Sequence, residues 1–422
     1  MENQLQNNMS KIKTEQLKEA VITGKQTLSN IQVTPMTLKQ EMMFIGKHVM
    51  EEYLLTAQQI VTELKKDEDI LIGPGWGWMI SSHVCRTLGL TSINPCDINV
   101  TPALTWGNDL DYPIINIEVD EGSALTVLEK AKQLFGYDNV AATLENTEGM
   151  MSSYTLLICN DGIRKHINVE ESVDGAGNKF LCTKESIKEI TDSKLLRFNI
   201  LPSAILSRIK RIQNLIAKNG KEAPRLYEKW IWNENYKQFS DGDLSGIPLF
   251  ECNSIQEVTK MLIRRNNYGS FNTLLDIQGL FYSREGYYLY DDKEIAKYQK
   301  SHGLLMLLEK PLFPWGFLYR EDFEWFLSGW MGFSWSHSAH VMLLADEKKE
   351  REAEMWKHRY LMQGINNGFG YTELNQIWDS VFRRKYKKTL PSKAHVAGRL
   401  YLSVFLARLK NEFPEEFNAI KE

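Results

Sequence analysis

The sequence predicts an α+β protein in which a mixed sheet, complete by about residue 200, is followed by a mainly helical half. Short strand patterns alternate with helical patterns in the first half, as at Pro113–Val119, where Ile115, Ile117 and Val119 lie on one face. After Pro224, helical periodicity dominates. With 43% hydrophobic and 25% charged residues, the 422-residue chain has the composition of an ordinary soluble globular protein.

Three regions follow from these patterns. Residues 1–35 are rich in Gln, Asn, Lys and Ser and are expected to form a loosely attached polar arm with a short helix at Glu15–Thr23. Residues 36–200 form the predicted α/β domain, and residues 201–422 the helical domain. Beyond the helical pattern of residues 36–66, the strands expected are 69–72, 113–119, 140–144, 154–159, 179–183 and 195–200, and the helices 79–88, 122–137 and 201–219.

Cysteine content and hydropathy restrict the class of protein. The five cysteines are scattered and form no CxxC pair, which argues against a disulfide framework or a zinc module: Cys85, Cys96, Cys159, Cys182 and Cys252. No apolar run of 18 residues and no signal peptide is visible, so we expect a cytoplasmic protein without membrane contact. A net charge of -4 argues against a surface coated for nucleic acid but leaves room for a local basic patch.

A glycine-rich turn follows the first predicted strand. It contains Gly73, Gly75, Trp76, Gly77 and Trp78, and a helix and a second strand with polar residues two apart come after it. This is the layout of a nucleotidyltransferase palm, in which a glycine turn cradles a triphosphate and a strand presents metal-binding carboxylates.

A series of collinear segments resembles the palm and fingers of the bacterial replicative DNA polymerase III alpha subunit, a C-family DNA polymerase. The turn stands where the family has GPGRGS, and 113–119 where it has PDIDxDF. Other segments that resemble family motifs are LGLTSINP (88–95), FGYDNVA (135–141), LRFNIL (196–201), GIPLFE (246–251), LFY (280–282), PSKAHVAG (391–398) and LKNEFPEEF (409–417).

The resemblance runs from about Met36 to the C-terminus. It implies a polymerase-beta-like palm followed by a fingers-like domain. The family's PHP domain and clamp-binding region have no expected counterpart, and its thumb would fall between Leu144 and Tyr154, where only a short connector is expected.

The same resemblance implies that the active site is degenerate. The family's catalytic acid positions fall on Asn116, Glu118 and Asn199, which leaves one carboxylate where hard Mg²⁺ ions need several. The Arg and Ser of its triphosphate turn fall on Trp76 and Trp78. Its fingers arginines fall on Tyr282, Leu343 and Leu344. We therefore expect an inactive polymerase relative with no cofactor and no metal.

Two acid pairs keep an enzymatic alternative open. Glu118 and Asp120 lie two apart on one strand face, and Asp109 and Asp111 form a similar pair upstream. A remodelled Mg²⁺ site on Glu118 and Asp120 would make the protein an active nucleotidyltransferase or DNA polymerase. The competing interpretation is a solvated or helix-capping acid at a strand end.

Two further clusters have a functional and a structural interpretation. His337 and His340 could share a helix face as metal ligands, but surface or packing histidines are the more common outcome. The aromatic run Trp315–Trp335 could stack bases, yet at helical spacing it is more often part of a core.

A basic segment is the strongest remaining functional signal. Seven cations fall within 17 residues without an intervening acid: Arg383, Arg384, Lys385, Lys387, Lys388, Lys393 and Arg399. Such a concentration suits phosphate contact, and Lys260, Arg264 and Arg265 on a neighbouring predicted helix favour the same function. The expected partner is DNA or another nucleic acid, a replisome protein, or both; a protein-interaction module without nucleic-acid binding is the alternative.

Overall fold

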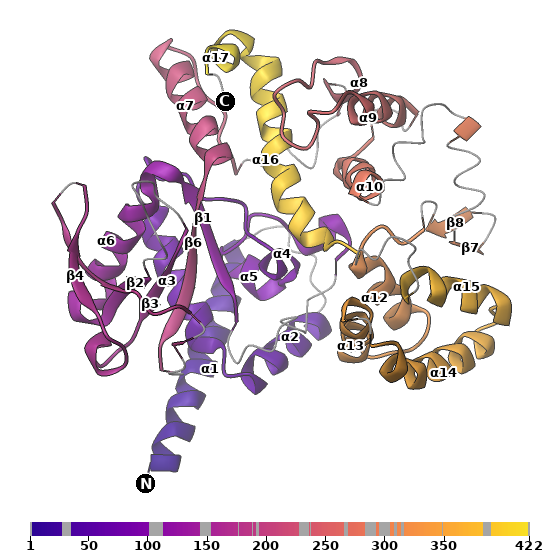
Figure 1. Cartoon of the computed structure of the whole chain (residues 1–422), viewed down its shortest axis with the longest axis horizontal. Helices are drawn as coiled ribbons and strands as arrows, with labels where there is room; N and C mark the ends of the chain where they lie inside the picture. The colour runs from indigo at the N-terminus through magenta and orange to yellow at the C-terminus, as the bar shows by residue number, and fades with distance from the viewer. Residues whose placement is uncertain are drawn as a thin grey trace. The chain divides into compact units, whose positions relative to one another are not determined.

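The α+β prediction is confirmed by the computed structural model, which contains a six-stranded mixed sheet and many helices (Figure 1). The structure describes residues 2–27, 35–100, 113–143, 153–175, 177–187, 189–190, 194–227, 236, 238–265, 269–282, 293–294, 304–307, 310–313, 316–347, 349–382 and 390–420.

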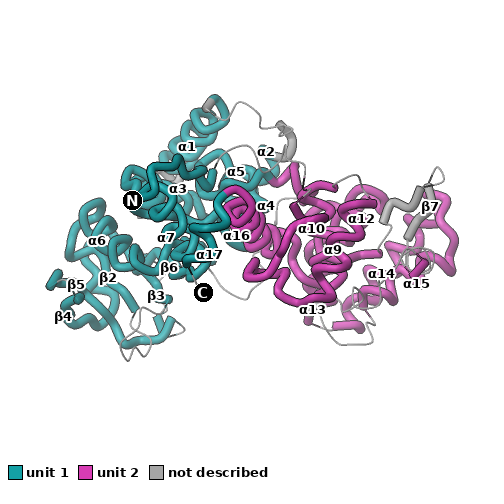
Figure 2. The backbone as a smooth tube through the Cα atoms, turned by 90° about the horizontal axis from the view of Figure 1, so that it is seen from above, with its two compact units in different colours: residues 1–94, 109–227, 413–422 teal, residues 95–108, 228–412 magenta. Residues whose placement is uncertain are grey.

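The chain divides into two compact units (Figure 2). Unit 1 comprises residues 1–94, 109–227 and 413–422, and unit 2 comprises residues 95–108 and 228–412. Unit 1 thus takes in the N-terminal region, the helix after the last sheet strand and the last ten residues, all of which the sequence analysis had assigned outside the palm-like region 36–200.

The sheet of unit 1 has the strand order β1-β6-β3-β2-β5-β4. β1 and β6 are parallel, as are β2 and β5, and the remaining neighbours are antiparallel. The strands are β1 (Ile115–Asp120), β2 (Val140–Thr143), β3 (Tyr154–Ile158), β4 (Glu170–Val173), β5 (Lys179–Thr183) and β6 (Leu196–Ser203).

Five of these strands fall on predicted segments, and β4 was missed. β4 pairs with β5 alone and is largely exposed, so its sequence lacks the apolar alternation that signals a half-buried strand. The predicted strand at 69–72 is reduced to a bridge between Ile72 and Val119, along the edge of β1.

One face of the sheet is covered by α3 (Glu51–Leu64) and α6 (Ala124–Phe135). Tyr53 of α3 packs its ring against Phe198 of β6, and the Tyr154 hydroxyl of β3 donates to the Ala124 carbonyl at the start of α6. Because strand side chains alternate, the residues adjacent to these in sequence point to the opposite face. That opposite face carries the candidate site.

The N-terminal region contains a long helix that packs within unit 1. α1 runs from Glu2 to Thr27, and its Leu17 and Val21 are buried. The Thr14 hydroxyl donates to the Glu51 carboxylate at 2.8 Å. A Cβ on Gly24 would lie 1.9 Å from the Thr87 carbonyl oxygen, so glycine permits the close approach. Among residues 12–26, Leu17 and Val21 are the buried residues, so the apolar stripe of this part of the helix is narrow.

The remaining helices of unit 1 flank the sheet and its connections. They are α2 (Pro35–Lys47), α4 (Trp78–Ser81), α5 (His83–Thr87), α7 (Ala204–Lys218) and α17 (Pro414–Ala419). The predicted helix 79–88 is split at Ser82, whose extended backbone caps α5 through its hydroxyl. α17 returns to α7, where Lys221 pairs with Glu416 at 2.7 Å and Arg208 stacks on Phe417.

Unit 2 is mainly helical, with one two-stranded hairpin formed by β7 (Leu304–Leu307) and β8 (Lys310–Phe313). Its described α-helices are α8 (Gln238–Asp241), α9 (Asn253–Arg265), α10 (Phe271–Tyr282), α12 (Arg320–Gly329), α13 (Trp335–Asp346), α14 (Glu350–Asn366), α15 (Tyr371–Phe382) and α16 (Lys393–Glu412).

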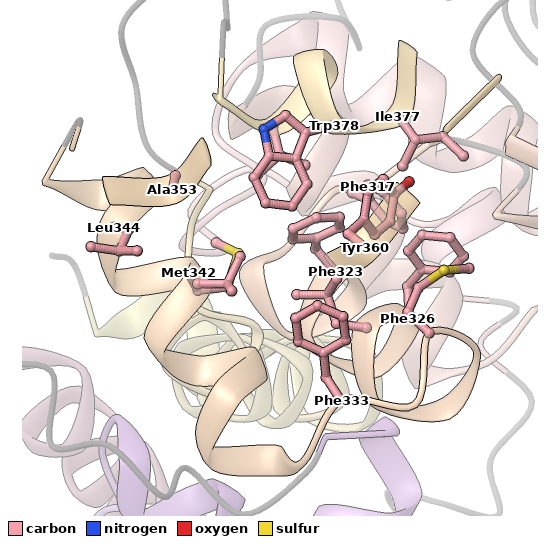
Figure 3. Close-up of a cluster of buried hydrophobic side chains, with 14 of the residues drawn as sticks. Phe317, Phe323, Phe326, Phe333, Met342, Leu344, Ala353, Tyr360, Ile377 and Trp378 are labelled. Carbon is pink, nitrogen blue, oxygen red and sulfur yellow. The ribbon is translucent and has the colours of Figure 1, made fainter. Parts of the chain in front are cut away.

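An aromatic core fills the space between α12, α13, α14 and α15 (Figure 3). Phe317, Phe323, Phe326 and Phe333 are all buried there, and Phe323 meets Trp378 edge-on. The core interpretation of the aromatic run is therefore confirmed for these residues.

All five cysteines are free, as the lack of paired spacing predicts. Among the described residues, no helix is long and apolar enough to cross a membrane.

Candidate functional site

The parallel pairing of β1 and β6 brings together two of the three positions at which the sequence resemblance predicts catalytic acids. Asn116 and Asn199 are register partners, and the Asn199 side-chain nitrogen donates to the Asn116 side-chain oxygen at 2.9 Å. Both side chains are half-buried. A pair of carboxylates at this separation would repel, whereas two amides satisfy each other.

A third residue completes this contact. The Thr155 hydroxyl of β3 donates to the Asn199 side-chain oxygen at 3.1 Å, and the Thr155 backbone amide donates to the Thr143 hydroxyl of β2. The strand registers therefore place a polar row across the face opposite α3 and α6, formed by Asn116, Asn199, Thr155 and Thr143. Thr155 was not identified from the sequence, because only the sheet register makes it a neighbour of Asn199.

Glu118 lies two residues after Asn116 on β1 and contacts the glycine turn. Its side chain is 9% exposed. A Cβ on Gly73 would come within 2.3 Å of a Glu118 carboxylate oxygen, and the Gly73 amide donates to the Glu118 carbonyl at 2.7 Å. The turn and the acid strand are thus in direct contact, and glycine at position 73 leaves room for the carboxylate.

Asp120, the other half of the possible carboxylate pair, has structural partners at both oxygens. One oxygen accepts from the Lys210 ammonium at 3.0 Å, and the other from the Leu71 amide at 2.9 Å and the Ser123 hydroxyl at 2.7 Å. The side chain is 3% exposed. These contacts tie β1 to α7 and to the segment before the turn, so a metal ion at Asp120 would have to displace them.

The turn keeps a tightly packed backbone. The Pro74 carbonyl accepts from the Thr91 hydroxyl at 2.7 Å and from the Ser92 amide at 2.8 Å. A Cβ on Gly75 would lie 2.7 Å from the Thr91 hydroxyl oxygen. Gly75 and Gly77 both have positive φ, at 111° and 56°, which explains why glycine is needed there.

The two tryptophans of the turn are half-buried. The Trp78 indole nitrogen donates to the Ile114 carbonyl, immediately before β1, at 2.6 Å. The indole is therefore fixed beside the start of the strand that carries Asn116, at the position where the family has a hydroxyl side chain. It offers an apolar ring and a donor already in use, neither of which suits a triphosphate.

The site thus offers two amides, two threonine hydroxyls and one carboxylate. Mg²⁺ is usually held by carboxylates, waters and substrate phosphates, and two-ion phosphoryl transfer needs several acids to balance the charge. The geometry of a palm is present, because strand register and turn place the family positions side by side. Of the negative charge that a pair of metal ions needs, only the Glu118 carboxylate remains at these positions.

A buried acid that the sequence did not reveal caps α5, which follows the turn and α4 in the chain. Glu41 of α2 is 4% exposed and accepts from the Ser82 hydroxyl and from the amides of His83 and Val84, at 3.1 and 3.3 Å, so it caps α5. Burial raises its pKa to about 7, although these hydrogen bonds act in the opposite direction. An acid within a helical pattern gives no sequence signal for such a role.

Two of the seven cations of the basic segment lie among the described residues. Arg383, Arg384, Lys385, Lys387 and Lys388 lie outside the described residues. Of its two described members, Arg399 on α16 is exposed, whereas Lys393 is buried with its ammonium 3.8 Å from an Asp322 oxygen.

The cations on α9 also have acidic neighbours. Lys260 pairs with Glu257 at 3.3 Å, and Arg264 with Asp241 at 3.1 Å. Neither pair excludes phosphate contact, since all four side chains keep solvent exposure.

The remaining candidates from the sequence are two histidines, residues aligned with the family's fingers arginines, and an upstream acid pair. The rings of His337 and His340 both pack against Trp356, which supports the packing interpretation. Leu344 is buried in the aromatic core, while Tyr282 is 48% exposed. Asp109 and Asp111 lie outside the described residues.

Comparison with protein families supports the palm. Residues 7–153, about a third of the chain, match the family described as the bacterial DNA polymerase III alpha NTPase domain. The match begins within α1, well before Met36, and it includes the turn and β1. No curated protein matches the chain. Residues 7–153 therefore carry a domain of the DNA polymerase III alpha type.

Proposed function

We propose that this protein is a catalytically inactive DNA polymerase III alpha-like protein that acts by binding nucleic acid. The observation that carries the proposal is the hydrogen bond from Asn199 to Asn116, which joins two neutral amides where the family has catalytic acids. The surroundings of Asp120 support it, because the oxygens of that carboxylate already accept from Lys210, Ser123 and Leu71.

The binding half of the proposal rests on the basic segment. Four of its cations, Arg383, Arg384, Lys387 and Lys388, fall within six residues of a chain whose net charge is -4. Arg399 adds an exposed cation on the helix that follows. Phosphate binding by such a cluster is driven by counterion release and is therefore steeply salt-dependent.

A primer-extension assay tests the loss of catalysis. The full chain is incubated with primed DNA, all four deoxynucleotides and either Mg²⁺ or Mn²⁺, and we expect no extension. Extension that disappears in Glu118→Ala and Asp120→Asn would instead establish an active nucleotidyltransferase with a remodelled metal site.

A salt titration of DNA binding tests the other half. We expect the full chain to bind labelled DNA with an affinity that falls with salt. Replacing Arg383, Arg384, Lys387 and Lys388 by Gln should reduce the slope of log K against log[salt] by up to about 3 to 4, at roughly 0.9 per phosphate contact.

A matched variant controls for net charge. Replacing the exposed Lys25, Lys39, Lys47 and Lys218 by Gln removes the same total charge from other parts of the surface and should leave the slope nearly unchanged. Equal losses in both variants would mean that only the overall charge matters.

Absence of binding to any DNA or RNA at low salt would contradict the nucleic-acid function. In that case, DNA-independent capture of replication proteins by the full chain would identify the protein as an interaction module.

A further inference from the structure

The loop that follows β3 brings together three side chains with metal-ligand chemistry. Cys159, Asp161 and His166 each offer one ligand atom, and these atoms lie within 4.8 Å of one another. The His166 Nε2 and Asp161 Oδ1 atoms are 2.6 Å apart. Eight residues of chain thus supply a thiol, a carboxylate and an imidazole at one point.

The local fold explains the convergence. Gly162, with φ at 102°, turns the chain back after β3, and the 3₁₀ helix Ile163–Lys165 then delivers His166 to the end of the strand.

The surroundings are apolar on one side and open on the other. Cys159 packs in a buried cluster with Ala141, Leu157, Ile163 and Ile167. The Asp161 side chain is 48% exposed, so the group can be reached from solvent. Apolar packing around the cysteine and access from solvent at another ligand are features of metal centres in proteins.

We propose that Cys159, Asp161 and His166 bind one divalent transition-metal ion, for which Zn²⁺ is the best fit. A thiolate, an imidazole and a carboxylate are the ligands that Zn²⁺ accepts in tetrahedral sites, and three protein ligands leave the fourth position to water. Mg²⁺ and Ca²⁺ prefer oxygen-only ligand sets, so this donor set selects against them.

The geometry requires only side-chain adjustment. Bond lengths of about 2.3 Å to sulfur and about 2.0 to 2.2 Å to nitrogen and oxygen place tetrahedral ligands roughly 3.3 to 3.6 Å apart. The His166–Asp161 contact must widen by about 1 Å, as the ion replaces the proton they share.

Protons and neighbouring cations set the conditions for binding. A metal ion binds cysteine as the thiolate, so the ion must displace the Cys159 thiol proton to solvent. Lys165 and Lys194 are near enough to interact with the Asp161 carboxylate. Their positive charges oppose a bound dication, so binding should strengthen as added salt screens them.

This centre is separate from the palm row. Thr155 precedes Cys159 by four residues on the same strand face, which corresponds to about 13 Å along an extended strand. Its test is therefore independent of catalysis and of DNA binding.

The experiment is a titration of the metal-depleted full chain with Zn²⁺ alone, followed by calorimetry, and with Co²⁺, followed by absorption. We expect one ion per chain and a thiolate-to-cobalt charge-transfer band. Cys159→Ser and His166→Asn should each weaken Zn²⁺ binding at least about tenfold, and Cys159→Ser should abolish the band.

Matched controls separate the site from general effects. Cys182→Ser replaces another buried thiol, and His48→Asn an exposed imidazole; both should bind Zn²⁺ as the unchanged chain does. Asp161→Asn changes an exposed side chain and keeps the test valid if the buried Cys159→Ser fails to fold.

Either of two results would overturn the proposal. One is the absence of stoichiometric Zn²⁺ binding by the folded chain, and the other is Zn²⁺ binding that Asp161→Asn and His166→Asn leave unchanged.

Discussion

Asn199 donates its side-chain amide to Asn116 across the parallel strands β6 and β1, at a distance of 2.9 Å. The Thr155 hydroxyl donates in turn to Asn199, so the hydrogen bonds run in one direction across three strands. The resemblance to the DNA polymerase III alpha family aligns these amides with catalytic acids. Two acids at such positions need metal ions to balance their charge, whereas the two amides are joined by a hydrogen bond.

Replacing both asparagines by aspartate should make the stability of the sheet depend on a bound metal ion. In Asn116→Asp/Asn199→Asp, two carboxylates would meet beside Glu118, and the free energy of unfolding should fall by about 1 to 3 kcal/mol in chelator. Denaturant titrations with and without Mg²⁺ measure this, and Mg²⁺ should recover part of the loss.

The single variant Asn116→Asp is the control for the acid pair. It keeps the donor of Asn199 and should cost clearly less than the double variant, since a carboxylate accepts that hydrogen bond. An equal loss in the two variants, or no difference between chelator and Mg²⁺, would contradict the role assigned to the amides.

Asp120 is expected to stabilise the fold. Asp120→Asn removes the charge that faces Lys210 and weakens the acceptor for Ser123 and Leu71, so it should lower the free energy of unfolding by about 1 to 3 kcal/mol. Urea denaturation with Lys210→Met and the double variant should give less than additive losses.

A partly exposed ion pair provides the comparison for Asp120. Glu63→Gln removes the charge that faces Lys66 and, at 4.0 Å, Lys130, and it should have a smaller effect because these contacts remain open to solvent. If Asp120→Asn is as mild as Glu63→Gln, the buried carboxylate does not hold β1 to α7.

Glu41 should make stability depend on pH. Burial raises its pKa from 4.5 to about 7, so the folded state binds a proton more tightly than the unfolded state. The free energy of unfolding should therefore fall as pH rises from about 4.5 to about 7, by an amount on the order of 3 kcal/mol.

Thermal and urea unfolding across this pH range should show the effect as a difference between the unchanged chain and Glu41→Gln. The variant should lack this part of the slope. Glu19→Gln removes an exposed carboxylate of α1 and should leave the slope unchanged. Parallel curves for all three proteins would exclude Glu41 as the group responsible.

Gly24 should be essential for docking α1. A Cβ at this position would lie 1.9 Å from the Thr87 carbonyl oxygen, so Gly24→Ala should destabilise unit 1 by about 1 to 3 kcal/mol or release α1. Limited proteolysis would detect release as faster cleavage within residues 2–27.

Gly46→Ala in α2 is the matched helical substitution. Its new Cβ would meet nothing closer than 3.6 Å, so the gain in helix propensity should appear without a clash. Release of α1 in both variants would show that the contact with Thr87 is not what matters.

Several features could be predicted because they are local. The alternation at Pro113–Val119 predicted β1, and the glycines at 73, 75 and 77 predicted a turn, in which Gly75 and Gly77 adopt positive φ. In contrast, the pattern of α1 is weak because, among residues 12–26, only Leu17 and Val21 are buried. β4 was missed because an exposed edge strand carries little pattern.

By itself, the sequence determined the class of fold and the chemical identity of the palm positions, because strand alternation, glycine spacing and residue type are properties of short segments. Only the tertiary structure decided how those positions interact. Register pairs Asn116 with Asn199, α7 presents Lys210 to Asp120, and the loop after β3 gathers Cys159, Asp161 and His166. Each contact joins residues whose proximity depends on chain direction and packing, which no local pattern encodes.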